Sequence, residues 1–154
     1  YGPWGRPDMA PMIFAKSILE NKPINIFNNG LMKRDFTYIS DIVEATFLCC
    51  LKPATKNKNF DSNNPDPATS FAPHMILNIG CGKPIDLLHF INLLEEALGI
   101  KAIKNFLPMQ PGDVVATSSD ISLLEKWVKY KPSVKVEDGV KHFAKWYLQY
   151  FKDL

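Results

Sequence analysis

The segment "IDLLHFINLLEEALG", residues 85–99, constrains the fold of this chain more than any other stretch. Its apolar residues recur at the spacing of one helix face. They are Leu87, Ile91, Leu94 and Leu98. Asp86 stands where a helix N-cap is favoured, and Gly99 stands where a helix-terminating glycine is favoured. The pattern predicts an amphipathic helix whose apolar face must pack against a core.

Helical and strand-like patterns on both sides of this segment predict a mixed α/β fold without a regular β-α-β alternation. Apolar residues at helical spacing predict further helices over 12–21, 41–51, 120–130 and 135–151. Short runs of β-branched and aromatic residues predict strands over 23–27, 33–39, 75–79 and 100–106.

Residues 53–75 separate the two halves of this pattern. They are rich in Asn, Asp, Pro, Ser and Lys and have almost no hydrophobic periodicity, which predicts a long exposed loop. The pieces on either side are too small to hold separate cores. We therefore interpret residues 1–154 as one folding unit, with 53–75 as an insertion.

Composition excludes several classes of protein. The 18 Lys and Arg residues balance 16 Asp and Glu residues and are scattered, which argues against nucleic acid as a partner. No apolar stretch approaches about 18 residues, and no signal peptide is visible, so neither a membrane span nor secretion is expected. The three cysteines, Cys49, Cys50 and Cys81, lack metal-site spacing and predict buried free thiols in a cytoplasmic protein.

Three polar stretches are the candidates for binding. They contain Arg6, Arg34, and the turn from Gln110 to Asp113. An arginine side chain offers a planar set of donors suited to phosphate or carboxylate, so the two arginines are candidate anion ligands. The same residues also allow a local interpretation. Arg6 can pair with Asp8, Arg34 with the adjacent Asp35, and Asp113 can accept from nearby backbone amides.

Other catalytic and cofactor patterns are missing from the sequence. No three glycines have GxGxxG or GxxGxxG spacing, and no tyrosine is followed four residues later by a lysine. His74, His89 and His142 lie far apart and have no paired-ligand spacing. The sequence therefore predicts no catalytic residue, no dinucleotide fingerprint and no metal site within this chain.

Taken together, four stretches resemble the C-terminal half of UDP-glucuronate 4-epimerases, a branch of the extended short-chain dehydrogenase/reductase superfamily. They are "YGPWGRPDMA", "RDFTYISDIVEA", "LNIGCGKPIDLLHFINLLEEALG" and "LPMQPGDVVATSSD". The resemblance implies a substrate-binding lobe whose N-terminal Rossmann domain is missing from this chain, with strand 75–79 completing the sheet of that domain. Elements built to pack on another domain are then expected to leave an exposed apolar patch that promotes self-association.

The resemblance also implies an activity for a full-length protein. That activity is the NAD-dependent C4 epimerisation of UDP-glucuronate to UDP-galacturonate, by removal and return of a hydride. NAD would be bound mainly by the missing domain, the full-length protein would be a homodimer, and this chain alone would be inactive. Two alternatives stay open: a sister nucleotide-sugar epimerase or dehydratase with another substrate, and a non-catalytic UDP-sugar-binding module.

Roles for individual residues follow from the same resemblance. It implies that Arg6 contacts the uronate carboxylate and that Arg34 pairs with the diphosphate. Asp113 would accept from the ribose hydroxyls, and Gln110 would face the same nucleotide. Phe27 would line the uracil site, where the contacts are mainly made by the backbone.

Overall fold

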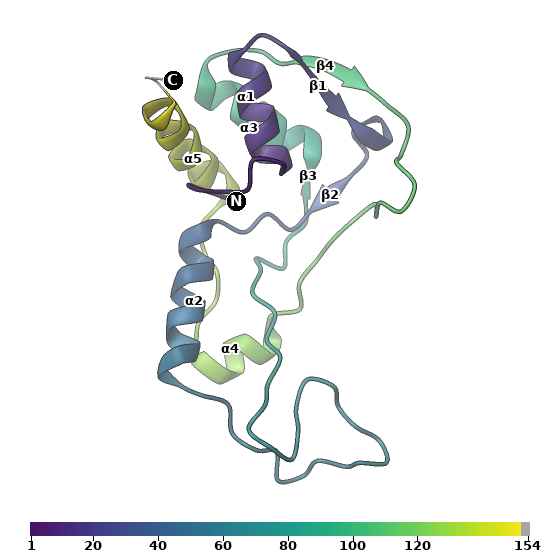
Figure 1. Ribbon diagram of the computed structural model, residues 1–154, viewed down its shortest axis with the longest axis vertical. Helices are drawn as coiled ribbons and strands as arrows, with labels where there is room; N and C mark the ends of the chain where they lie inside the picture. The colour runs from purple at the N-terminus through teal and green to yellow at the C-terminus, as the bar shows by residue number, and fades with distance from the viewer. Residues whose placement is uncertain (152–154) are drawn as a thin grey trace.

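The computed structural model describes residues 1–151 and has the predicted mixed α/β fold (Figure 1). The helices are α1 (Ala10–Leu19), α2 (Ile39–Leu51), α3 (Leu87–Leu98), α4 (Ser122–Val128) and α5 (Val136–Tyr150), with a short 3₁₀ segment, η1, over Phe27–Gly30. The strands are β1 (Pro23–Ile26), β2 (Lys33–Arg34), β3 (Ile85–Asp86) and β4 (Ile103–Phe106). No helix within the described residues is long and apolar enough to span a bilayer.

The apolar face of α3 forms the centre of the core. Phe90, Ile91 and Leu94 are completely buried, and α1 and α5 pack against this helix (Figure 1). Gly99 ends α3 in the left-handed conformation, at φ 71°, as the sequence predicts. Asp86 stands at the N-cap, but its side chain caps no backbone amide and instead lies 3.4 Å from the ammonium group of Lys33.

The strands form two small sheets. Strands β1 and β4 pair in parallel, with Pro23 opposite Ile103 and Ile26 opposite Phe106. Burial alternates along β1, so Ile24 and Ile26 point into the core. Strands β2 and β3 pair in antiparallel orientation, which places Arg34 next to the start of α3.

The strand predicted over 33–39 is wrong beyond its first two residues. The chain leaves the sheet at Asp35, whose carboxylate accepts hydrogen bonds from backbone amides of other segments. The Phe36 ring then stacks on Phe90 with 4.1 Å between ring centroids. Helix α2 already begins at Ile39. Side-chain contacts, and not a longer strand ladder, therefore determine the path of this segment.

Residues 53–75 contain no helix or strand, which agrees with the predicted loop. Within the described residues, the only strand-like pairing of the predicted strand 75–79 is an isolated bridge between Met75 and Thr69. Its expected partner was a sheet outside this chain. The role of 75–79 in such a sheet, like the interpretation of 53–75 as an insertion, therefore stays a prediction.

Helix α2 presents an exposed apolar row. Ile39, Val43, Phe47 and Leu51 recur every fourth residue and are between 37% and 67% exposed. Only Asp41 and Ala45 of this helix are buried. The row is the kind of exposed patch that the sequence predicts, and its effect on self-association stays a prediction.

The cysteines differ in part from expectation. All three are free thiols, but Cys50 is exposed on α2, while Cys49 and Cys81 are half-buried. The prediction of three buried thiols is therefore wrong for Cys50. Its position on the outer side of a helix with few packing partners explains the exposure. The cytoplasmic location inferred from the cysteine pattern stays a prediction.

Glu95 is a buried carboxylate that ties the end of α3 to β4. It accepts hydrogen bonds from the Lys101 ammonium at 2.8 Å, from the Ala102 amide at 3.2 Å and from the Lys104 ammonium. Burial by itself raises the pKa of this carboxyl. The hydrogen bonds from Lys101, Lys104 and Ala102 outweigh burial and hold the pKa below its ordinary value.

Replacing Glu95 by Gln should therefore lower the free energy of unfolding at pH 7 by about 1–3 kcal/mol. Because the folded-state pKa is lowered, the stabilisation is present above the unfolded-state pKa and is lost as the pH falls through the folded value. The variant should thus lose less stability on acidification than the unmodified chain. Urea unfolding followed by circular dichroism at pH 7 and pH 4 measures both effects.

The matched control is Glu96→Gln, because Glu96 is the exposed neighbour of Glu95 on the same helix. It should change stability by less than about 0.5 kcal/mol. Equal losses in the two variants would contradict a special role for the buried carboxylate.

Candidate functional site

A cavity of about 750 Å³ lies between α1, β1, β2 and the segment 110–117. Four of the five residues predicted to bind a ligand line it: Phe27, Arg34, Gln110 and Asp113. Much of the wall is apolar and comes from α1 and β1, including Ile13, Phe14 and Ile24. A concave apolar site with a few convergent polar groups is the usual form of a small-molecule site.

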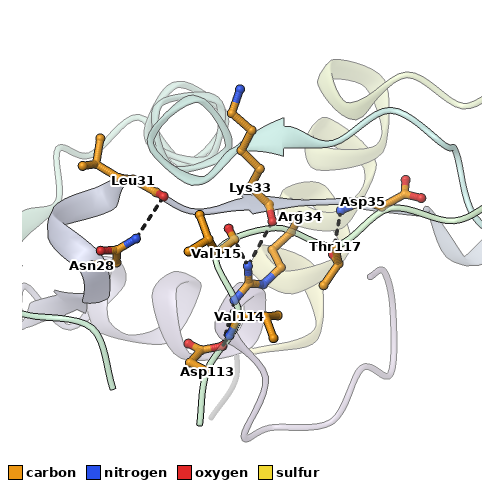
Figure 2. A network of polar contacts seen from close by, with 9 residues as sticks. All are labelled: Asn28, Leu31, Lys33, Arg34, Asp35, Asp113, Val114, Val115 and Thr117. Carbon is orange, nitrogen blue, oxygen red and sulfur yellow. Dashed lines mark hydrogen bonds and ion pairs between the residues drawn. The ribbon is translucent and has the colours of Figure 1, made fainter. Parts of the chain in front are cut away.

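Arg34 is the cation of this cavity, and its side chain is held from several sides (Figure 2). Its guanidinium donates to the carbonyl oxygens of Lys33 at 2.9 Å and Val115 at 3.2 Å, and to Asp113 Oδ1 at 2.9 Å. The side chain is 25% exposed. The local interpretation in which Arg34 pairs with Asp35 is therefore wrong, because its carboxylate partner is Asp113.

The segment around Asp113 reaches Arg34 because it runs beside β2. The Lys33 amide donates to the Val115 carbonyl at 2.9 Å, and the Thr117 amide donates to the Lys33 carbonyl at 3.2 Å. Asp113 Oδ1 also accepts from the Val114 amide at 2.8 Å. Asp113 thus serves both as the partner of a cation and as an acceptor for the backbone.

The turn before Asp113 is tight. The Asp113 amide donates to the Gln110 carbonyl at 3.2 Å, and Gly112 has a φ of 82°. A left-handed backbone of this kind favours glycine. The turn places Gln110 at the rim of the cavity with an exposed side chain.

Phe27 follows β1 at the other wall of the cavity. The Leu107 amide donates to the Ile26 carbonyl at 2.9 Å, which continues the parallel pairing past the strand ends. Asn28 and Asn29 then turn the chain with positive φ values of 51° and 50°. Phe27 is half-buried and packs against the core, so its position is fixed by the sheet.

Arg6 does not lie in this cavity. It is 74% exposed and forms a bidentate pair with Asp8, with Nε to Oδ1 at 3.1 Å and Nη2 to Oδ2 at 2.6 Å. The hydrogen bond and charge of Arg6 hold the pKa of the Asp8 carboxyl below its ordinary value. Arg6 lines a smaller neighbouring cavity of about 320 Å³, and Asp8 borders the main one.

Sequence reasoning missed the role of Asp35. Its carboxylate accepts from the amides of Cys81 at 3.1 Å, Gly82 at 3.0 Å and Ser119 at 2.9 Å. The residue borders both cavities. No spacing in the sequence relates position 35 to 82 or 119. Its adjacency to Arg34 in "KRDF" is the only available signal, and that signal suggested a different contact.

The described residues provide no metal site, because no group of three or more His, Cys, Asp or Glu side chains within 1–151 is arranged to hold an ion. What the main cavity offers instead is one fixed guanidinium with the Asp113 carboxylate beside it, the carboxylates of Asp8 and Asp35, and an apolar wall. Such an arrangement suits a ligand that carries an anionic group together with hydroxyl and apolar groups.

Comparison with known proteins finds similarity to one protein family and to several individual proteins. Residues 1–64 match the sequence profile of the NAD dependent epimerase/dehydratase family. Protein CapI of Staphylococcus aureus is 45% identical over 152 residues, which are 99% of this chain and 46% of that protein. The probable UDP-glucuronate 4-epimerase of Rhizobium meliloti is 44% identical over 99% of this chain and 45% of its own length. The first 64 residues are therefore similar to the NAD dependent epimerase/dehydratase family, and nearly the whole chain is similar to these two proteins.

The fold is shared with solved structures of this epimerase group. The UDP-glucuronic acid 4-epimerase from Bacillus cereus, in complex with UDP-glucuronic acid and NAD, superposes with a TM-score of 0.78 at 33% identity. The match covers 98% of this chain and 43% of the Bacillus cereus chain. The resemblance and the α/β fold class expected from the sequence are confirmed. The chain spans less than half the length of these relatives.

Gly80 lies where the loops around Asp35 meet. A Cβ atom at this position would overlap the Ser119 hydroxyl and would lie 2.6 Å from Ser119 Cβ and 2.9 Å from Asp35 Oδ2. Gly80→Ala should therefore force the two loops apart and destabilise the chain by about 1–3 kcal/mol, measured by urea unfolding.

Adding Ser119→Gly to Gly80→Ala removes the Cβ and hydroxyl that overlap. The double variant should therefore recover part of the lost stability. Unchanged stability in Gly80→Ala, or no recovery in the double variant, would contradict the close contact between these loops.

Proposed function

We propose that this chain forms the nucleotide-sugar site of an NAD-dependent epimerase that converts UDP-glucuronate to UDP-galacturonate at C4. The observation that carries the proposal is the cluster of Arg34 and Asp113 in an apolar cavity. The similarity to proteins named as UDP-glucuronate 4-epimerases supports the choice of substrate. A homodimer is part of the same proposal for the full-length protein.

Within this proposal, Arg34 binds the diphosphate. Its guanidinium is already oriented by two carbonyl oxygens and a carboxylate, so little side-chain entropy is lost when an anion binds. Asp113 accepts from the ribose hydroxyls, and Gln110 faces the nucleotide from the rim. Phe27 and its backbone line the uracil site, at the end of the parallel pair of strands.

Arg6 is proposed to recognise the uronate carboxylate. Asp8 holds its guanidinium through two hydrogen bonds, the geometry that a second carboxylate prefers. Binding therefore requires Arg6 to exchange Asp8 for the substrate carboxylate. Both side chains are largely exposed, so this exchange disrupts no buried contact.

NAD is proposed as the cofactor of the full-length protein, because the matched family is NAD dependent. The main cavity does not fit NAD. None of the residues lining it is a glycine, whereas a dinucleotide pyrophosphate requires close approach to a glycine-rich turn at a helix N-terminus. We therefore derive no redox step from the residues of this chain and propose that NAD is bound outside it.

The binding role of Arg34 is tested by titrating the full chain with UDP and uridine in a calorimeter. The unmodified chain should bind UDP. Arg34→Ala should weaken UDP binding about 10- to 100-fold, because a charge-assisted contact to phosphate is lost. Uridine binding should change by less than about two-fold, since uridine has no phosphate for Arg34 to contact.

Lys58→Ala is the control for net charge, since Lys58 is an exposed cation of the loop 53–75. It should leave UDP binding unchanged. Absence of UDP binding by the unmodified chain, or equal affinities of the unmodified and Arg34→Ala chains, would overturn the proposed site.

The role of Arg6 is tested by comparing UDP-glucuronate with UDP-glucose, which lacks the carboxylate. Arg6→Ala should lower the preference for UDP-glucuronate by about ten-fold or more and leave UDP-glucose affinity unchanged. Asp8→Asn should raise the affinity for UDP-glucuronate, because the competing internal carboxylate loses its charge. If Arg6→Ala lowers the affinities for UDP-glucuronate and UDP-glucose equally, then Arg6 does not bind the carboxylate.

A further inference from the structure

The Asp35 carboxylate joins two loops that are far apart in the sequence. Its Oδ1 accepts from the Cys81 amide, and its Oδ2 accepts from the amides of Gly82 and Ser119. The Asp35 amide in turn donates to the Thr117 hydroxyl at 3.2 Å. One residue thus holds the segment after β2, the turn at 81–82 and the segment 117–119 together.

These contacts come from backbone amides and not from cations. Among the described residues, no lysine or arginine forms an ion pair with Asp35, so neutral N–H groups satisfy its carboxylate. Hydrogen bonds from N–H groups to a carboxylate are among the stronger ones in proteins. The amides of two successive residues, Cys81 and Gly82, both donate to this carboxylate. Gly82 has a φ of 65°, in the left-handed region that favours glycine.

Asp35 and Arg34 act on the same segment from opposite sides. Figure 2 shows the Asp35 carboxylate pointing away from the Arg34 guanidinium, so the two side chains do not compete for one partner. Arg34 holds the segment at Asp113 and Val115, whereas Asp35 holds it at Thr117 and Ser119. The path of this segment, which supplies two of the acceptors of Arg34, is therefore fixed at both ends.

We propose that Asp35 is a positioning residue that fixes the Arg34 guanidinium for the phosphate groups of the ligand. This inference rests on the proposed function. In this proposal Asp35 acts by holding the backbone of residue 34 and of the segment 113–119, and not through its own contact with the phosphate groups. Its loss therefore weakens recognition of the anion more than recognition of the nucleoside, because Phe27 and Gln110, the other proposed nucleoside contacts, lie outside this segment.

Asp35→Asn in the full chain is the first test, because the amide keeps one acceptor oxygen and replaces the other by a donor. UDP affinity should fall about 5- to 10-fold, and uridine affinity should fall by a clearly smaller factor, both measured by calorimetry. Thr117→Val removes the acceptor of the Asp35 amide and is a milder second variant. It should weaken UDP binding in the same selective way, even if Asp35→Asn fails to fold.

The control is Asp61→Asn. Asp61 is an exposed loop carboxylate that also accepts a backbone amide, from Asn63 at 2.9 Å. Asp61→Asn should leave the affinities for UDP and uridine unchanged. The chain with both Arg34→Ala and Asp35→Asn should bind UDP no more weakly than Arg34→Ala alone, because Asp35 acts through Arg34.

Four results separate the explanations. Equal weakening of UDP and uridine by Asp35→Asn, or additive losses in the double variant, would show a general structural role and overturn the inference. Unchanged UDP affinity in a folded Asp35→Asn chain would overturn it as well, while the Arg34 site itself would stand. Failure of the unmodified chain to bind UDP would overturn the proposed function, and the inference with it.

Discussion

Burial of the apolar face of α3 is the interaction on which the other parts of this molecule depend. Helices α1 and α5 pack against it, and the rings of Tyr1 and Phe36 contact Phe90 from the side of the opening loop and of β2. Because Phe36 is stacked on Phe90, the residues just before it are held at a fixed distance from the core. Packing of Phe36 on the core thus determines the positions of Arg34 and Asp35.

The candidate site lies between an apolar wall and a polar wall, and both are positioned by this core. One wall consists of residues of α1 and β1, including the core residues Phe14 and Ile24, and the other consists of the polar segment beside β2. Arg34 stands at the boundary, three-quarters buried but with its charge balanced by Asp113. A cation in such a position keeps its charge and its orientation, which are the two properties needed to recognise an anion.

The parts of the fold that the sequence predicts well are those governed by local periodicity. Helix α3 and its glycine end follow from residues 85–99, since each interaction lies within a few positions along the chain. The strand predicted over 33–39 was wrong because Asp35 bonds to amides more than 45 residues away, a contact that no local pattern contains. The resemblance to a longer protein led us to expect an exposed apolar patch, but the sequence did not indicate that it would lie on α2.

In the candidate site, too, the sequence predicted the residue types but not their long-range contacts. Residue types selected Arg34, expected at the start of a strand, and Asp113, expected in a tight turn, and the structure brings them together although 79 positions separate them. The resemblance gave Arg6 a role in the same site, but its side chain lies over a neighbouring cavity because Asp8 offers a closer carboxylate. Which of several nearby carboxylates an arginine selects depends on tertiary geometry that sequence spacing does not contain.

The parallel pairing of β1 with β4 has a consequence for how the cavity forms. The paired residues Asn25 and Asn105 lie 80 positions apart, so this contact closes a long loop, and the entropy of that closure must be overcome before the ladder yields any stabilisation. Non-local pairings of this kind lower the folding rate of a domain. The wall that carries Phe27 is therefore complete only after a long-range contact has formed. Any ligand of this cavity would therefore bind only chains in which this long-range contact has already formed.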